Sequence, residues 1–403
     1  MKKILALVLV LAMALSCAAC ASTENSKENV AEEYADTKLV DQLGQIYMGT
    51  DAEVDVQQAD VHMDAVEVSA NGNFEALYVP IEIEGRANDY LDFDLTPTAE
   101  ELEAMKNEPI YGQPILYLVY EGCSSATSVA DINGYYKDAG LVVEGLRGAT
   151  YVEALGTDQA QVAISHIATS LVPITNGVDI TFVGGAHLAC KSLFVLADSP
   201  YMTTEDLKGT KISVPNGIGK SDYNITSLML DDDGINPQKD VELIQVSADA
   251  CVAAMENGEI SAALLSDIYA FPMMKEGKLR VISSMLDSDY SEVSICCAIS
   301  MSGKFVKENP VHAKKLTQAI QKAGSWLREN PDEAVDLMLA EGLASGDREM
   351  NKLINGSYQF GLSNEFAYAN FQEIVSRYIK LGLITSMDDV QEVVDLAWTN
   401  LVD

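Results

Sequence analysis

The chain has 403 residues, of which 48% are apolar, and it carries a formal net charge of −35 at pH 7. Such a large negative charge argues against nucleic acid and anionic membrane surfaces as partners. Once the N-terminal leader described below is removed, the chain is still longer than one hydrophobic core usually organises, so we expect at least two domains.

The first residues have the pattern of an export signal. Two lysines precede an apolar run at 4–15, and small residues then lead to Cys20. The run is too short to cross a hydrocarbon core, which needs about twenty apolar residues. We expect residues 1–20 to be a lipoprotein signal peptide that is cleaved before Cys20, whose thiol then carries lipid such as palmitate. Cys17 is the second candidate for lipidation.

A lipid anchor would place the protein on the extracytoplasmic face of the cell membrane. ATP, NADH and chromosomal DNA are not freely available there, so enzymes that consume them become poor candidates. Gly219-Lys220-Ser221 imitates the end of a phosphate-binding loop, but the first glycine that such a loop requires is replaced by Val214. Sequence and location therefore both argue against ATP binding.

Residues 21–110 are expected to form a tether and an accessory segment. The tether is polar and acidic, which is typical of disordered chain. Farther along, Asn71 and Gly72 lie between two apolar stretches and favour a hairpin with a type I′ turn. Thr98 and Glu101 have the spacing of a capping box that opens a short helix.

From residue 115 onward, apolar segments of strand length alternate with helical segments, a pattern that predicts parallel α/β sheets. A first series of strands is expected at 115–120, 141–143, 162–165 and 178–183. A second series is expected at 211–214, 241–246, 262–265, 279–283 and 294–299. The helical tail has a buried face that consists of Leu316, Ile320, Ala323 and Leu327.

Three segments, at 151–165, 176–180 and 199–215, resemble the solute-binding proteins of ABC importers. The nearest branch takes up nitrate, sulfonates, taurine or thiamine-pyrimidine precursors. The most specific motif runs from Asp206 to Ile212 and follows a strand-helix-strand series. The resemblance implies an α/β, two-lobed periplasmic-binding-protein type II fold with two hinge crossovers, preceded by the accessory segment.

This fold implies a division of the chain into two lobes. We expect lobe 1 to consist of residues 111–198 and 299–403, and lobe 2 of residues 199–298. The chain would then cross between the lobes near 198–200 and again near 297–300, and two crossovers side by side permit bending about one axis.

Ligands of open α/β sheets bind beyond the carboxyl ends of strands, where helix N-termini supply unpaired N–H groups. Polar loops are expected at these places, including one at 184–187 after the fourth strand. The candidate ligand-binding residues are Cys123, Ser124, Ser125, Ser165, His166, Gly185, His187, Gly217, Gly219, Lys220, Ser221 and Asp267. Asp222 and Asp267 are suited to holding an ammonium or amidine group, and Lys191 and Lys220 are the cations nearby.

The cysteines and histidines near the expected strand ends are Cys123, His166, His187 and Cys190. They are soft-metal or haem ligand types, but they lack the short paired spacing of common metal sites. We expect no metal and no cofactor, and the sequence leaves open whether these side chains converge. The adjacent Cys296 and Cys297 are expected to point to opposite faces of a strand and not to pair with each other.

The sequence contains no G-x-S-x-G or H-E-x-x-H motif, so it does not predict an enzyme. We expect a monomeric lipoprotein that captures a small organic solute between its lobes by hinge closure and delivers it to an ABC permease with its ATPase. The solute classes are sulfonate, nitrate, taurine and pyrimidine-like compounds. Two alternatives stay open: a ligand-binding surface receptor for a sensor, and a thiamine-precursor-type enzyme of the same fold.

Overall fold

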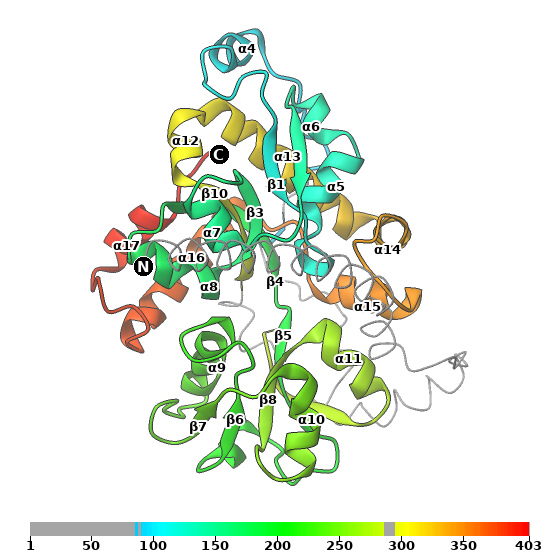
Figure 1. The fold of residues 1–403 in the computed structure, drawn as a ribbon, viewed down its shortest axis with the longest axis vertical. Coiled ribbons are helices and arrows are strands. Elements are labelled where there is room, and N and C mark those ends of the chain that lie inside the picture. Colours follow the sequence, from blue (N-terminus) through cyan, green and yellow to red (C-terminus); the bar gives the residue numbers. More distant parts are fainter. Residues whose placement is uncertain (1–84, 88–89, 286–294, 403) are drawn as a thin grey trace, which may run out of the picture. The chain divides into compact units, whose positions relative to one another are not determined.

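The computed structural model describes residues 85–87, 90–285 and 295–402 (Figure 1). The chain divides into two units, 1–53 and 54–403, and every described residue belongs to the second. The predicted leader, tether and Asn71-Gly72 hairpin lie outside the described residues. Among the helices that are described, none is both long and apolar enough to cross a membrane.

Two five-stranded sheets form the framework of the described chain (Figure 1). The first sheet has the order β2-β1-β3-β10-β4 and the second has the order β7-β6-β8-β5-β9. The strands of the first sheet are β1 (Ile115–Leu118), β2 (Val143–Leu146), β3 (Val162–His166), β4 (Ile180–Leu188) and β10 (Ile295–Ser302). Those of the second are β5 (Lys191–Leu196), β6 (Lys211–Ser213), β7 (Glu242–Ile244), β8 (Ala262–Ser266) and β9 (Leu279–Ser284).

Neither sheet is purely parallel, which corrects the expectation from the sequence. β10 pairs antiparallel with β3 and β4, and β5 pairs antiparallel with β8 and β9. A parallel neighbour needs a long crossover, usually a helix, between the two strands. β5 instead follows β4 after only Ala189 and Cys190 and enters the second sheet directly. The second sheet is thus inserted in the sequence between β4 and β10 of the first.

Helices cover both sheets. Those of residues 99–175 are α4 (Ala99–Met105), the short 3-10 helix η2 (Gly122–Ser124), α5 (Ala126–Ile132), α6 (Tyr135–Asp138), α7 (Tyr151–Gly156) and α8 (Ile167–Thr175). Those between the strands of the second sheet are the 3-10 helix η3 (Thr204–Leu207), α9 (Ser221–Asp232), α10 (Ala248–Glu256) and α11 (Asp267–Lys275). The C-terminal helices are α12 (Gly303–Glu308), α13 (Pro310–Glu329), α14 (Pro331–Ala340), α15 (Arg348–Ser357), α16 (Asn364–Lys380) and α17 (Val390–Ala397).

Two local predictions are confirmed in these helices. Thr98 Oγ1 accepts a hydrogen bond from the Glu101 amide at 3.1 Å, and a Glu101 carboxylate oxygen accepts one from the Thr98 amide at 3.0 Å. The capping box therefore opens α4 as expected. The apolar face of α13 is buried, consisting of Leu316, Ile320, Ala323 and Leu327.

The chain changes sheet between Leu188 and Lys191, and it changes back between Ser284 and Ile295. The first change comes earlier than the expected 198–200 because residues 184–187, expected to be a loop, lie inside β4. A Cβ on Gly185 would lie 2.6 Å from Ala367 Cβ, so glycine there permits close packing of α16 and not a turn. The run Lys191–Leu196, which the sequence analysis did not assign, is the returning strand β5.

Candidate functional site

Strand β10 lies between β3 and β4 and brings their ends together at one edge of the first sheet. Cys297 pairs in register with His166, the last residue of β3, and with His187 near the end of β4. The carboxyl ends of both strands and the beginning of β10 therefore meet in one place. This is the edge at which α/β proteins bind ligands.

The second sheet presents the corresponding edge to the same crossover. Lys191 and Ser192 at the start of β5 pair with Ser266 at the end of β8 and Ser284 at the end of β9, respectively. Because β5 follows β4 almost immediately, this edge adjoins that of the first sheet. A Cβ on Gly122 of η2 would lie 3.6 Å from the side chain of Ile268 in α11, so η2 and α11 lie close to each other.

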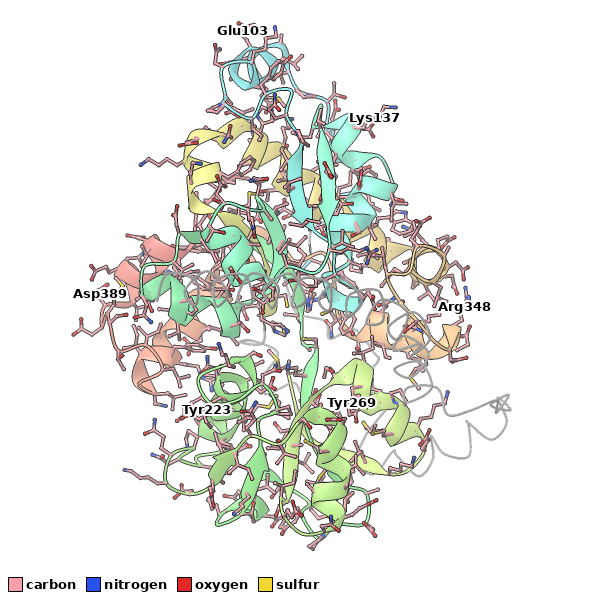
Figure 2. All side chains as sticks on the ribbon, in the orientation of Figure 1. Glu103, Lys137, Tyr223, Tyr269, Arg348 and Asp389 are labelled. Atoms are coloured by element: carbon pink, nitrogen blue, oxygen red, sulfur yellow. The ribbon has the colours of Figure 1, made fainter. Side chains whose placement is uncertain are left out.

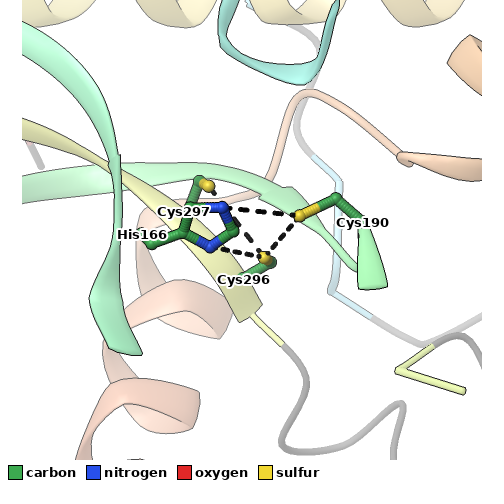
Figure 3. A group of neighbouring side chains, drawn as sticks. All are labelled: His166, Cys190, Cys296 and Cys297. Carbon is green, nitrogen blue, oxygen red and sulfur yellow. Dashed lines mark hydrogen bonds between the residues drawn. The ribbon is translucent and has the colours of Figure 1, made fainter. Parts of the chain in front are cut away.

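Four side chains meet beside this crossover (Figure 3). Cys190 Sγ lies 3.0 Å from Cys296 Sγ and 3.8 Å from His166 Nε2. Cys296 Sγ lies 3.3 Å from His166 Nδ1, and Cys297 Sγ lies 4.0 Å from Cys296 Sγ. All three thiols are free and buried. These four residues are called the thiol-imidazole cluster below.

An irregularity in β10 explains how two adjacent cysteines join one cluster. Ile295 pairs with Leu188 and Cys297 pairs with His187, so Cys296 is an extra residue opposite β4. Such a bulge rotates the strand locally and redirects side chains. The sequence expectation that Cys296 and Cys297 point to opposite faces assumed a regular strand. The expectation that they do not pair with each other agrees with their free thiols.

A second group adjoins the cluster. Ligand atoms of Cys123, His187 and Cys297 all lie within 4.8 Å of one another, so Cys297 belongs to both groups. His187 is fully buried, and its Nδ1 lies 2.5 Å from the Leu188 carbonyl oxygen and 3.0 Å from that of Ala189. Nδ1 therefore carries the proton and donates, while Nε2 makes no hydrogen bond to any described residue.

The electrostatics of the cluster favour a thiolate beside an imidazolium. Burial raises the pKa of the Cys296 thiol, but the neighbouring thiols and His166 lower it well below its usual value. Burial alone would lower the pKa of His166, yet Cys296 and Cys190 raise it well above its usual value. The thiol of Cys123, the largest cause, lowers the pKa of Cys190 to about 6. The cluster can therefore hold negative charge on sulfur.

A buried ion pair holds the edge of the second sheet. Lys191 is paired with Asp222 at the start of α9. Asn216 donates its amide to Asp222 Oδ2 at 2.8 Å and its side-chain Nδ2 to Oδ1 at 3.1 Å. Asp222 and Lys191 therefore satisfy each other, and the pair positions the loop before α9.

Asp267, at the start of α11, is in a different state. Its side chain is fully buried and accepts one hydrogen bond, from Ser192 Oγ to Oδ1 at 2.8 Å. Oδ2 has no hydrogen-bond partner among the described residues. Burial raises the pKa of Asp267 well above its usual value. Asp267 is thus a buried acid with one oxygen left for a ligand.

The predicted serines and glycine of the first sheet have partners within the protein. Ser125 Oγ donates to Met338 Sδ at 3.7 Å. Ser165, which directly precedes His166 in β3, has its Oγ 2.6 Å from Ser300 Oγ. Gly185 is covered by α16, as described above. Ser124 is partly buried, with its Oγ 3.9 Å from Cys123 Sγ.

The predicted residues before α9 form a turn. Gly217 and Gly219 have φ values of 96° and 73°, which favour glycine. Lys220 is exposed at the N-cap of α9, and Ser221 Oγ donates to Asp222 Oδ1 at 3.3 Å. In this arrangement Lys220 is an exposed cation, whereas Ser221 supports the buried ion pair.

Sequence reasoning missed the aromatic side chains around His187. The ring centroid of His187 lies 5.6 Å from that of Tyr358 and 5.7 Å from that of Phe360. Both residues come from the segment after α15, far from His187 in the sequence, so no local pattern could reveal them. Figure 2 shows the side chains of the whole described chain, including Tyr223 on α9 and Tyr269 on α11.

A separate concavity of about 540 Å³ lies between α7 and the loop that precedes β4. Its lining includes Glu153, Thr157 and Asp179. None of the residues predicted to bind ligand lines it. The strand edges therefore remain the candidate site.

A family model described as NMT1/THI5 like matches residues 124–334, which is just over half of the chain. The chain belongs to the NMT1/THI5-like family. The matched range includes the whole second sheet and every strand of the first sheet except β1. No curated protein sequence matches the chain.

Solved structures show the fold of this family member. The aliphatic sulphonate binding protein SsuA from Escherichia coli matches with a TM-score of 0.58 at 15% identity, covering 71% of this chain and 92% of its own. The alkanesulfonate-binding protein SsuA from Xanthomonas axonopodis pv. citri, bound to MOPS, matches with a TM-score of 0.56 at 15% identity, over 71% and 97%. The nitrate-binding protein NrtA from Synechocystis PCC 6803 has a TM-score of 0.53 at 16% identity, over 71% and 85%. The predicted periplasmic-binding-protein fold is confirmed.

Proposed function

We propose that this protein is an extracytoplasmic solute-binding lipoprotein of an ABC import system. It captures a small organic solute of the sulfonate, nitrate, taurine or pyrimidine type at the joined edges of its two sheets. The proposal rests on one observation: the edges of the two sheets at which the strands end lie next to each other where the chain passes from β4 to β5. The names of the SsuA and NrtA proteins, which share the fold, support these solute classes.

The lobes follow from the sheet to which each strand belongs. We place lobe 1 at about 111–188 and 295–403, and lobe 2 at about 191–285. The chain then crosses from lobe 1 to lobe 2 at 189–190 and is back in lobe 1 at Ile295. Bending at two adjacent links allows one lobe to rotate against the other about a single axis.

Polar contacts between α9 of lobe 2 and helices of lobe 1 support hinge closure. Arg377 of α16 forms an ion pair with Asp232 and donates from Nη2 to the Leu228 carbonyl oxygen at 2.9 Å. Asn224 Nδ2 donates to the carbonyl oxygen of Ala168 in α8 at 2.8 Å. We propose that these contacts form on closure, and that solute favours closure by binding the closed arrangement more tightly.

Anchoring and delivery complete the proposal. Cys20, or Cys17 in its place, carries the lipid that holds the monomeric protein on the outer face of the cell membrane. The loaded protein docks on a permease that works with a cytoplasmic ATPase. The structures that share the fold are named as binding proteins, which supports a carrier and not an enzyme.

Thermal unfolding with candidate solutes tests the function. Sulfonates, nitrate, taurine and pyrimidines are added to the full chain, and a true solute stabilises it by about 2.7 kcal/mol at a hundredfold excess over Kd. Mass spectrometry of the released compound then distinguishes carriage, which leaves it unchanged, from catalysis. If no compound of these classes raises the melting temperature, the proposed solutes are wrong. If the released compound is chemically altered, the carrier function is wrong.

Two variants test the second-lobe side of the site with the solute found in that screen. We expect Asp267→Ala to weaken binding because Oδ2 is a buried oxygen with no hydrogen-bond partner among the described residues. We expect Lys220→Ala to weaken it because this exposed cation stands at the start of α9. Lys239→Ala, an exposed lysine of the same lobe, is the control and should leave Kd unchanged. Unchanged affinity in both test variants by calorimetry would remove these residues from the site.

A further inference from the structure

The thiol-imidazole cluster is more than solute capture requires. Three buried thiols and one imidazole are gathered from β3, the β4–β5 link and β10, which are distant in sequence. Bare thiols contribute little hydrogen bonding to a protein interior, so packing alone does not account for three sulfur atoms around one imidazole. The expectation of no metal rested on the lack of short paired spacing among these residues in the sequence.

We propose that the thiol-imidazole cluster is a zinc site, with Cys190, Cys296, Cys297 and His166 as ligands. Three cysteines and one histidine are one of the common ligand sets of structural zinc. The ion would be held by thiolates, and its binding would release the protons of the thiols. This site is separate from the proposed solute capture, so either can fail without the other.

The interatomic distances fit a four-coordinate ion. Ligand atoms about 2.0–2.3 Å from a tetrahedral zinc lie about 3.5–3.8 Å from one another. In the cluster, two pairs of sulfur atoms lie 3.0 and 4.0 Å apart. His166 Nδ1 lies 3.3 Å from Cys296 Sγ and its Nε2 lies 3.8 Å from Cys190 Sγ, and one of these two nitrogens would bind the ion. All four ligand atoms lie within 4.8 Å of one another. Small side-chain rotations would suffice to place an ion among them.

The unpartnered nitrogen of His187 is an independent indication. Its Nδ1 donates to backbone carbonyl oxygens, which fixes the tautomer that leaves Nε2 with a free lone pair. This nitrogen is buried, has no hydrogen-bond partner among the described residues, and lies in the group that shares Cys297 with the cluster. A buried lone pair without a donor is costly. It would be satisfied by a metal ion bound to Nε2 itself, within the group of Cys123, His187 and Cys297 that adjoins the cluster.

The position of the cluster gives the ion a structural consequence. Cys190 lies in the β4–β5 link and Cys296 lies two residues into β10 from the second link. An ion bound to both sulfur atoms would join the two crossovers at the point about which the lobes rotate. Zinc would therefore stabilise the hinge region without touching the solute.

Cobalt titration tests the site. The full chain is purified under anaerobic, reducing conditions, freed of metal by chelation, and titrated with Co²⁺. We expect thiolate-to-cobalt charge-transfer absorption in the near ultraviolet and visible bands of tetrahedral cobalt, both abolished by added Zn²⁺. Removing a residue that only supports a ligand weakens metal affinity by about 10–100-fold. The paired variant Cys190→Ser/Cys296→Ser removes two ligands, so its affinity for cobalt should fall by more than about 100-fold.

Cys251→Ser is the matched control. This thiol is also buried, but it lies in α10 and donates to the Ser247 carbonyl oxygen at 3.3 Å, outside the cluster. It should leave the cobalt spectrum unchanged. A chain that binds no cobalt or zinc, or a paired variant that binds as tightly as the wild type, overturns the proposal.

A second test uses only the wild-type chain, so it does not depend on whether the paired variant folds. Zinc should protect Cys190 and Cys296 from alkylation, as read by mass spectrometry of peptides, while labelling of Cys251 is unchanged. Equal labelling with and without zinc contradicts the site. So does a native Cys190–Cys296 disulfide in the protein as isolated from its cells, because its formation removes two of the four ligands.

Discussion

The two buried carboxyl groups at the edge of the second sheet, Asp222 and Asp267, have different partners. Asp222 has a lysine and two N–H donors around it, so it is an anion within a satisfied pair. Asp267 has one serine donor, and burial raises its pKa well above the usual value. We therefore expect burial to keep the proton on Asp267 to a higher pH than is usual for a carboxyl group.

Replacement by asparagine separates the two states. Asp222→Asn leaves Lys191 buried without its counter-charge and should lower the free energy of unfolding by about 3–5 kcal/mol. Asp267→Asn should be nearly neutral at low pH, where both folded and unfolded wild type carry the proton. Above about pH 4 the carboxyl group ionises in the unfolded chain but keeps its proton in the folded protein, so the free energy of unfolding of the wild type falls. The variant has no such loss and becomes more stable relative to the wild type. Urea unfolding from pH 4 to 8 measures both effects, and equal destabilisation at all pH values would contradict the assignment.

At the residue scale the sequence predicted ligand-type side chains but not their grouping. Residue type and strand-end position were enough to select Cys123, His166 and His187. Cys296 and Cys297 entered the cluster only through the bulge in β10, which has no signal in a short apolar run. The role of Gly185 depends on α16, almost two hundred residues later, so local sequence suggested a loop where the structure has a strand.

At the element scale, α4 is attached to the rest of lobe 1 by Glu101. This side chain caps its own helix and also forms an ion pair with Lys315 of α13 at 2.9 Å. Burial raises the pKa of Glu101, but the Thr98 amide and the lysines lower it to about 2. The carboxylate is thus stabilised in its charged form by the folded protein.

Glu101→Gln should therefore cost stability in a pH-dependent manner. A lowered pKa gives stability that is present above the ordinary value of 4.5 and is lost as pH falls toward 2. The difference in melting temperature between wild type and variant should shrink over this range. Glu103→Gln, which removes an exposed pair with Lys106, is the control and should have little effect. A difference that is independent of pH would contradict the role of the charge.

The strands were predicted well where apolar runs lie between turns, as in β3, β6, β8 and β9. β5 was missed because it begins with Lys191 and Ser192, polar residues that looked like part of a loop after β4. Their side chains are buried because they bind Asp222 and Asp267. The polar start of this strand is therefore a consequence of the site, and no propensity argument on one strand could have shown it.

At the scale of the whole molecule, the contacts of α16 with α9 give a test of hinge closure. Arg377 is buried and has two partners in α9, whereas Lys380 pairs with Asp231 at 2.9 Å while remaining well exposed. If these contacts belong to the closed arrangement, removing the buried one should weaken solute binding.

Arg377→Ala should raise the Kd of the solute by about tenfold, the effect of losing about 1.4 kcal/mol from the closed arrangement. Lys380→Ala should change it by little, because exposed ion pairs contribute about 0–1 kcal/mol. Calorimetry with the solute measures both, and small-angle scattering with and without solute follows closure directly. Identical Kd values in wild type and Arg377→Ala would argue that these contacts are present before solute binds.

The place of β10 in the first sheet has a consequence for how the chain acquires its structure. All strands of the second sheet come from the continuous stretch 191–284, so that sheet has its partners as soon as this stretch is available. The first sheet lacks the strand that joins β3 to β4 until residues 295–302 are available, because β10 lies between these two strands. When the chain is synthesised from its N-terminus, lobe 2 is therefore complete before lobe 1. Until β10 is made, β3 and β4 each have an unpaired edge where β10 will bind.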